Sequence, residues 1–231
     1  MVCLLVLALM VAAGCGKPAS HLTQAAPGAL PQDWTAATNE KFGLTLGVAP
    51  GWREGQPSMT AQMGLGGDTP PDPYGDPNAQ ALQDSLAKAN KTDAVKDREQ
   101  LEKDGILMLV SDGSRTLPGE EPNQYIIQHV SLPGEMDIEN GAKVARQELE
   151  FAHNPEFVDT PMGKAAKFVL NYTNKSGDKI HKAMFVFVDG KEMYELTFTN
   201  TGEDNKIKPI ADQVAQTFRI KPGLVFEAVK S

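Results

Sequence analysis

KIHKAMFVFVDGKEMYELTFTN, residues 179–200, is the stretch that decides the fold. Apolar and β-branched residues fill both of its halves, as is typical of strands. In the second half Tyr194, Leu196 and Phe198 share one face, because successive side chains of a strand point to opposite sides. The Asp189-Gly190 pair between the halves is typical of a type I′ turn. The stretch therefore predicts a β-hairpin with antiparallel strands at 179–188 and 192–200.

Further strands are predicted on the N-terminal side of this hairpin. Residues 164–173 form a further predicted strand directly before it, and Ser176-Gly177 is the turn that links the two. Three earlier runs are rich in strand-forming residues and end at glycine, proline or aspartate. They occupy residues 42–48, 106–110 and 124–132.

Two helices are predicted from apolar residues at helical spacing. The first begins after Asp137, whose side chain can accept hydrogen bonds from the first turn; the second follows Thr201 and Asp204, which resemble a capping box. The first stripe consists of Ile138, Ala142, Ala145, Leu149 and Ala152. The second consists of Ile207, Ile210, Ala211, Val214 and Phe218. Each stripe needs a sheet face to cover it, so we predict the α+β class, with an antiparallel sheet flanked by helices.

The order of these elements resembles that of the PsbP-like superfamily. The resemblance rests on the strand that runs into Ala49-Pro50-Gly51-Trp52, on the late strand with Tyr194-Glu195-Leu196-Thr197, and on a closing helix that ends in Thr217-Phe218-Arg219-Ile220. It covers residues 34–60 and 104–220. The family includes extrinsic lumenal proteins of photosystem II and bacterial lipoproteins. The resemblance implies an α/β/α sandwich with a central antiparallel sheet, and a non-enzymatic binding or assembly role. No functional motif of the family matches, so it transfers no site residue.

The N-terminus is typical of a bacterial lipoprotein. An apolar run from Val2 to Ala13 ends in Ala12-Ala13-Gly14-Cys15, like a signal peptide cut before a cysteine that carries lipid. The run is shorter than the about 20 apolar residues that a transmembrane helix needs. No lysine or arginine precedes it, which suggests a translation start further upstream. We predict a signal peptide at 1–14 and a lipidated flexible tether at 15–32; the alternative is a buried N-terminal helix with an incidental cysteine.

Composition limits the remaining choices. The 231 residues suffice for one domain, predicted at 33–221, followed by a fraying tail at 222–231. The formal net charge is −8, which argues against a nucleic-acid partner. The two cysteines, Cys3 and Cys15, both lie at the N-terminus, so the domain has no disulfide and no cysteine-based zinc site.

An irregular insertion is predicted at 62–103. Glycine and proline crowd its first half, and long loops of this kind are often functional. Its second half favours one or two amphipathic helices. We predict that Tyr74, with Met63 and Leu65 beside it, contacts a protein partner, since an apolar patch on a loop suits binding.

Candidate catalytic and metal sites are weak. The four histidines, at 21, 129, 153 and 181, lack ligand spacing. Asp68, Asp72 and Asp76 could bind calcium, but a solvated acidic loop is the simpler interpretation. The glycines at 64–67 lack the strand and Lys-Ser/Thr of a phosphate loop. We predict Trp52 as a core anchor rather than a pocket residue.

These patterns favour a membrane-tethered protein on the extracytoplasmic face of a bacterial membrane, in the periplasm. Its domain would bind a protein partner or assist assembly, without catalytic residues, metal or cofactor. Two alternatives stay open: a sensor for a small ligand or metal, and, less favoured, an enzyme.

Overall fold

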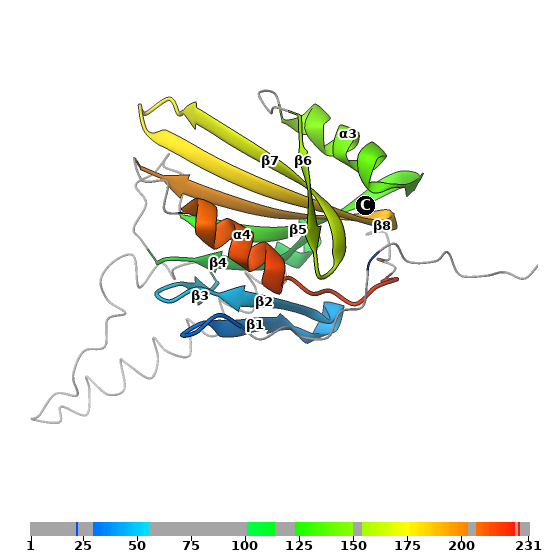
Figure 1. Cartoon of the computed structure of the whole chain (residues 1–231), viewed down its shortest axis with the longest axis horizontal. Helices are drawn as coiled ribbons and strands as arrows, with labels where there is room; N and C mark the ends of the chain where they lie inside the picture. Colours follow the sequence, from blue (N-terminus) through cyan, green and yellow to red (C-terminus); the bar gives the residue numbers. More distant parts are fainter. Residues whose placement is uncertain are drawn as a thin grey trace, which may run out of the picture.

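The computed structural model describes residues 22, 30–55, 101–113, 123–149, 154–202, 207–224 and 226 (Figure 1). Its strands are β1 (Thr35–Asn39), β2 (Leu44–Val48), β3 (Arg53–Glu54), β4 (Ile106–Ser111), β5 (Gln124–Met136), β6 (Glu156–Thr160), β7 (Gly163–Thr173) and β8 (Lys179–Thr201). Its helices are the 3-10 turn η1 (Glu40–Phe42) and the α-helices α3 (Ile138–Glu148) and α4 (Ile207–Thr217). β1 and β2 pair with each other, and the larger sheet has the order β3-β4-β5-β8-β7-β6, with every pairing antiparallel. A sheet with packed helices is thus present, as the sequence predicts.

β8 is a long extended run that doubles back on itself and contributes two neighbouring arms to the sheet (Figure 1). The N–H of Gly202 donates to the C=O of Lys179 at 3.0 Å, so the two ends of the run lie side by side. The first arm pairs with β7 through residues 179–186, and the second pairs with β5 through residues 192–199. The predicted hairpin is therefore confirmed at the centre of the sheet.

The turn of this hairpin differs from the predicted type I′ turn. Such a turn needs positive φ at both central residues, whereas Gly190 has φ 67° and Asp189 is not in the left-handed region. Lys179 lies opposite Gly202, and counting inward along both arms puts Asp189 opposite Glu192. Gly190 is therefore the first of the two central residues of the turn, and Lys191 is the second. A glycine in that position is typical of a type II′ turn. The carboxylate of Asp189 instead accepts a hydrogen bond from the N–H of Gly223 at 2.8 Å.

The two α-helices pack against opposite faces of the sheet. Alternate residues of the first β8 arm belong to two different core clusters. The even-numbered ones pack with residues of α3, namely Met184, Val186 and Val188. The odd-numbered ones pack with residues of α4, namely Ala183, Phe185 and Phe187. On the α4 side the β1–β2 pair adds a second covering element, and its Leu44 and Leu46 are fully buried. This larger cluster also holds Tyr125, Ile127, Leu196, Phe198, Val214 and Phe218.

Both predicted α-helices are present, and the predicted start of the first is confirmed. The Asp137 carboxylate accepts from the N–H of Asn140 at 2.8 Å, so the predicted N-cap of α3 is present. α3 ends at Glu148, before the predicted end at Ala152, and residues 150–153 lie outside the described part. α4 begins at the first residue of the second predicted stripe, Ile207, and ends directly before its last residue, Phe218. Thr201 closes β8, and its predicted capping partner Asp204 is outside the described residues.

Two predicted strand boundaries are wrong, and two strands are missing from the prediction. The strand predicted at 42–48 begins only at Leu44, because Phe42 belongs to η1 and Gly43 turns the chain at φ 54°. β5 continues beyond its predicted end at Leu132 through a register shift between Ser131 and Met136. β1 and β6 were not predicted at all.

Three apolar residues from the segments predicted as a tether and a fraying tail lie against the core. Leu22, in the predicted tether, is 7% exposed and belongs to the larger cluster. Beyond Pro222, in the predicted fraying tail, Leu224 and Phe226 pack against the same cluster. Apolar side chains in short flanking segments therefore extend the core at both ends of the domain.

Candidate functional site

A polar cluster lies where the β8 hairpin turns, on the α4 side of the sheet. Antiparallel pairing places His129 of β5 opposite Tyr194 of β8, and Ser131 opposite Glu192. The Nε2 atom of His129 contacts the Glu192 carboxylate, and both side chains are nearly buried. Ser131 Oγ lies 3.5 Å from the same carboxylate oxygen. No carboxylate at ligand spacing lies near His129 in the sequence, because Glu192 is 63 residues away and only the sheet register joins them.

The C-terminal segment closes this cluster. The ring of Phe226 stacks on the His129 imidazole, with centroids 3.6 Å apart and planes 16° apart. Phe42 of η1 stacks in turn on the ring of Phe226, with centroids 5.2 Å apart. Together with the Gly223 N–H held by Asp189, these contacts fasten Gly223 and Phe226 across the end of the hairpin.

Tyr194 contributes a buried phenol that stays protonated. It is fully buried, and its hydroxyl has no hydrogen-bond partner among the residues that the structure describes. Burial raises the pKa of Tyr194 well above its ordinary value, and the nearby carboxylates of Glu192 and Asp189 raise it further. The phenol is therefore a neutral group, not a base, at any physiological pH.

The cluster lacks the geometry of the common hydrolytic sites. The Ser131 hydroxyl donates to Glu192 rather than to the imidazole, so it does not form the serine–histidine pair of nucleophilic catalysis. Within the described ranges, no three histidine, cysteine or acidic side chains are placed to hold a metal ion. What the arrangement does is tie the C-terminal segment to the hairpin.

The two buried tyrosines of this face should respond oppositely to loss of their hydroxyl groups. Tyr194→Phe removes a buried donor without a partner, so we expect the free energy of unfolding to rise by about 1 kcal/mol. Tyr125→Phe removes a hydroxyl that donates to the C=O of Gly47 at 3.2 Å, so we expect a loss of about 1 kcal/mol. Urea titrations of both variants measure the difference. A destabilised Tyr194→Phe protein would mean that the hydroxyl has a partner.

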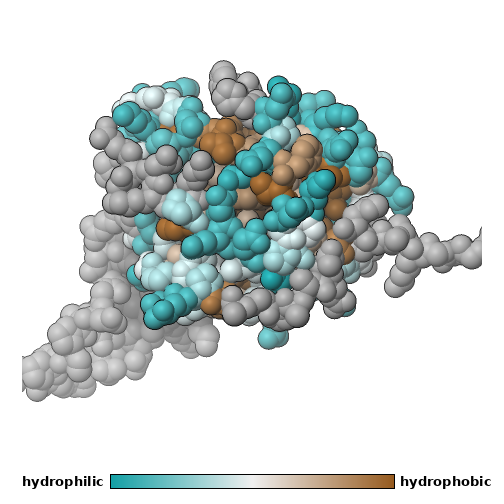
Figure 2. Space-filling model, viewed as in Figure 1, coloured by the Kyte–Doolittle hydropathy of each residue, from teal (hydrophilic) through white to brown (hydrophobic). Residues whose placement is uncertain are grey.

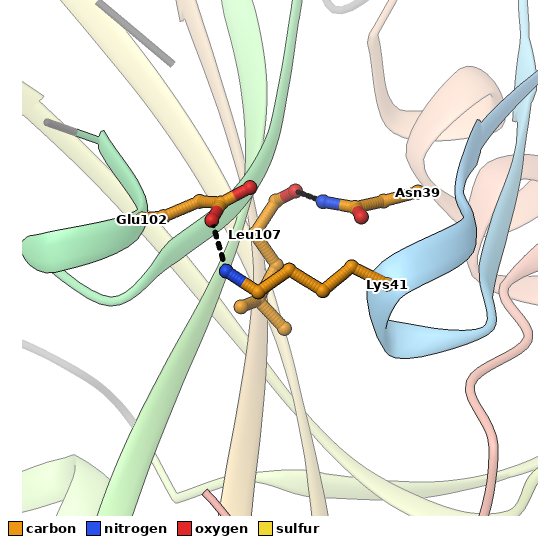
Figure 3. A network of polar contacts seen from close by, with 4 residues as sticks. All are labelled: Asn39, Lys41, Glu102 and Leu107. Atoms are coloured by element: carbon orange, nitrogen blue, oxygen red, sulfur yellow. Dashed lines mark hydrogen bonds and ion pairs between the residues drawn. The ribbon is translucent and has the colours of Figure 1, made fainter. Parts of the chain in front are cut away.

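A second polar network joins the N-terminal strand pair to the large sheet (Figure 3). Asn39, which is 2% exposed, donates from Nδ2 to the C=O of Leu107 in β4 at 2.8 Å. Lys41 reaches Glu102, at the end of the predicted insertion, with Nζ and Oε2 2.5 Å apart. Asn39 and Lys41 thus have partners within the fold. Their contacts hold β1 and η1 against the segment that leads into β4.

One small hollow lies beside α3. It has a volume of about 150 Å³ and is lined by Leu22, Asp137, Ile138, Lys164 and Val188. The carboxylate of Asp137 already caps α3. Lys164 is then the one other charged residue among lining residues that are otherwise apolar. Ligand sites combine an apolar lining with several convergent polar groups, and this hollow does not.

The predicted site residues fall mostly outside the described ranges. The structure does not describe Cys15, Met63, Leu65 or Tyr74, and it does not describe His21 or His153. Of the other histidines, His181 contacts Asn171 through Nδ1 at 2.6 Å. The prediction for Trp52 is confirmed, because its ring packs on the larger core cluster and lies 5.2 Å from Tyr125. None of the described helices is long and apolar enough to span a membrane.

Comparison with known proteins gives remote similarities to solved structures. No protein-family model matches the chain, and no curated protein sequence matches it. A solved structure from Bacteroides thetaiotaomicron VPI-5482 is 11% identical, with a TM-score of 0.40. The matched region covers 77% of this chain and 45% of the Bacteroides chain. The chain thus spans less than half the length of that protein. The solution structure of cyanobacterial PsbP (CyanoP) from Synechocystis sp. PCC 6803 is 12% identical with a TM-score of 0.43, and covers 84% of this chain and 98% of its own.

Proposed function

We propose that this protein is a lipid-anchored bacterial protein whose PsbP-like α/β/α domain binds a protein partner at the extracytoplasmic face of the membrane. The observation that carries the proposal is the apolar leader that ends in Ala-Ala-Gly-Cys at residues 12–15, a pattern typical of a cleaved signal before a lipidated cysteine. A lipidated cysteine moors a domain without any membrane-spanning helix. The acidic net charge of −8 favours a protein over a nucleic acid as partner.

A binding role fits the chemistry of the described residues better than catalysis. The His129–Glu192 pair is covered by Phe226 and holds the C-terminal segment in place. Lys167, only 7% exposed, is paired with Asp212 of α4. These ionisable groups serve contacts within the fold, and a binding domain needs no more than a rigid scaffold of this kind.

Replacement of the lipidation site tests the anchor. We expect the full chain, expressed with its upstream region in a bacterial host, to enter the detergent phase on Triton X-114 partition, and Cys15→Ser to move it to the aqueous phase. Cys3→Ser is the matched control, since Cys3 lies in the leader that cleavage removes. Mass spectrometry should find an N-terminal fragment that begins at Cys15 and carries acyl chains. An unmodified N-terminal fragment that still contains residues 1–14 would overturn the anchor.

Crosslinking in intact cells tests the partner. We expect one protein to be enriched with the anchored chain, and expect that enrichment to be lost when Met63, Leu65 and Tyr74 are all replaced by alanine. Point substitutions are preferable to deletion of 62–103, because Lys41 holds Glu102. Equal recovery with the triple variant would show that this part of the insertion is not the contact.

A further inference from the structure

Leu22 attaches the N-terminal part of the chain to one end of the sheet. It lies seven residues after Cys15 and is 7% exposed. It belongs to the core cluster on the α4 side, and it also lines the hollow beside α3 together with Ile138 and Val188. A side chain that contacts both sides of a sheet lies at its end, where the two sides meet. Val188 stands two residues before Gly190, so this end is the turn of the β8 hairpin, which we name the hairpin end.

The opposite end of the sheet is the turn from β7 to β8, at residues 174–178. The first arm of β8 joins the two ends, from Lys179 to Val188. Nine steps along a strand cover about 30 Å. The two turns lie at opposite ends of the sheet in Figure 1. Lys191 in the hairpin turn and Ser176 in the far turn are both exposed, so each can report the position of its own end.

The number of residues before Leu22 limits how far the hairpin end can lie from a lipid on Cys15. A chain extends by no more than about 3.6 Å per residue, so seven residues span at most about 25 Å in any conformation. With Leu22 free, the predicted tether at 15–32 would reach about 60 Å. The contact of Leu22 therefore shortens the reach by more than half and makes the hairpin end the point of attachment.

The described side chains at the hairpin end do not oppose contact with a lipid surface. Met136 pairs with Gly190, which places Glu135 beside the turn. Glu135 and Lys191 are both exposed, so this end presents charges of both signs rather than one sign that headgroups would repel. Figure 2 shows apolar surface that extends toward this end between hydrophilic side chains.

From this geometry we infer that the hairpin end, formed by residues 189–192 and the start of α3, faces the lipid headgroups, while the turn at 174–178 points away from the bilayer. The partner of this end is the lipid surface itself, and Leu22 holds the hairpin end within about 25 Å of it. The inference rests on the lipid anchor proposed above and adds which end of the domain that anchor holds.

Energy transfer to lipid headgroups measures which end lies nearer. The acylated full chain is purified and reconstituted into vesicles of phosphatidylethanolamine and phosphatidylglycerol that contain a headgroup-labelled acceptor lipid. A donor dye is attached to Lys191→Cys or, as the matched control, to Ser176→Cys. Acylation blocks the thiol of Cys15, and Cys3 leaves with the leader, so the added cysteine carries the one free thiol. We expect at least twofold greater transfer from position 191 than from position 176.

Lengthening the chain on either side of Leu22 is the decisive comparison. A Gly-Ser insert of about 12 residues is placed after Gly16 or, as the control, after Ala26. Before Leu22 it adds up to about 40 Å of reach, and we expect transfer from position 191 to fall at least twofold. After Leu22 the same insert should leave the transfer unchanged, because it lies beyond the point of attachment. Leu22→Asp should make the second insert as effective as the first, whereas Leu22→Ile should not.

Two results would overturn the inference: equal transfer from positions 191 and 176, or equal effects of the two inserts in the chain that retains Leu22. Failure of the anchor looks different. An unacylated chain would not float with the vesicles, and its Cys15 thiol would also take up dye, which would overturn the anchor together with the orientation that rests on it. A chain that floats with the vesicles but gives equal transfer contradicts the orientation alone.

Discussion

Phe198→Ala is expected to lower the free energy of unfolding by about 3–5 kcal/mol, the usual cost of removing a large aromatic side chain from a core. Phe198 is fully buried on the second arm of β8. It lies directly opposite Tyr125 of β5, with ring centroids 5.0 Å apart, and 6.5 Å from Phe185 of the first arm. Strands on both sides fix the backbone, so the cavity has little means to collapse.

Urea denaturation followed by fluorescence and circular dichroism measures this loss. Phe157→Ala is the control, because it truncates the same residue type at a position that is 43% exposed; its effect should stay within about 1 kcal/mol. If the two substitutions cost the same, the β8 hairpin is not at the centre of the core. A large change in the slope of the transition for either variant would mean that unfolding is no longer two-state.

Sequence patterns predicted the centre of the sheet because the signals there are local. In the second arm of β8 the alternation of side chains depends only on nearby residues, as do the glycines at the turns on both sides of the first arm, and the Asp137 cap depends on a contact three residues away. Such short-range chemistry survives in any tertiary context. The turn at Gly190 was located correctly, but its type was not, because the register of the two arms makes Gly190 the first of the two central residues rather than the second.

The missed elements depend on distant partners. β6, EFVDT, is short and carries two acidic residues, so it is a strand only because β7 lies beside it. β1, TAATN, is likewise fixed by its pairing with β2. The same cause explains the His129 cluster, in which strands β5 and β8 bring together groups far apart in the sequence and Phe226 arrives from the terminus. A pattern read along one chain contains no signal for these contacts.

A large effect is also expected at Gly47, where β2 is pressed against α4. A Cβ atom at this position would lie 2.8 Å from Thr217 Oγ1 and 2.9 Å from Trp34 Cε3. The Gly47 N–H also donates to Thr217 Oγ1 at 2.8 Å, and its C=O accepts from Tyr125. Since neither the helix end nor the indole can move without disturbing the core, a methyl group here must push β2 away.

Gly47→Ala should therefore lower the free energy of unfolding by about 2–4 kcal/mol, which combines the usual cost of overpacking with the loss of one hydrogen bond. Urea titration measures it against Gly134→Ala, where a Cβ would meet no atom within 4 Å and the glycine does not have a positive φ. The control should be neutral or slightly stabilising, because alanine restricts the unfolded chain. A second variant, Gly47→Ala with Thr217→Ser, removes the methyl group that lies 3.0 Å from the new Cβ and should recover part of the loss. If the double variant is no more stable than Gly47→Ala, steric pressure from the end of α4 is not the cause.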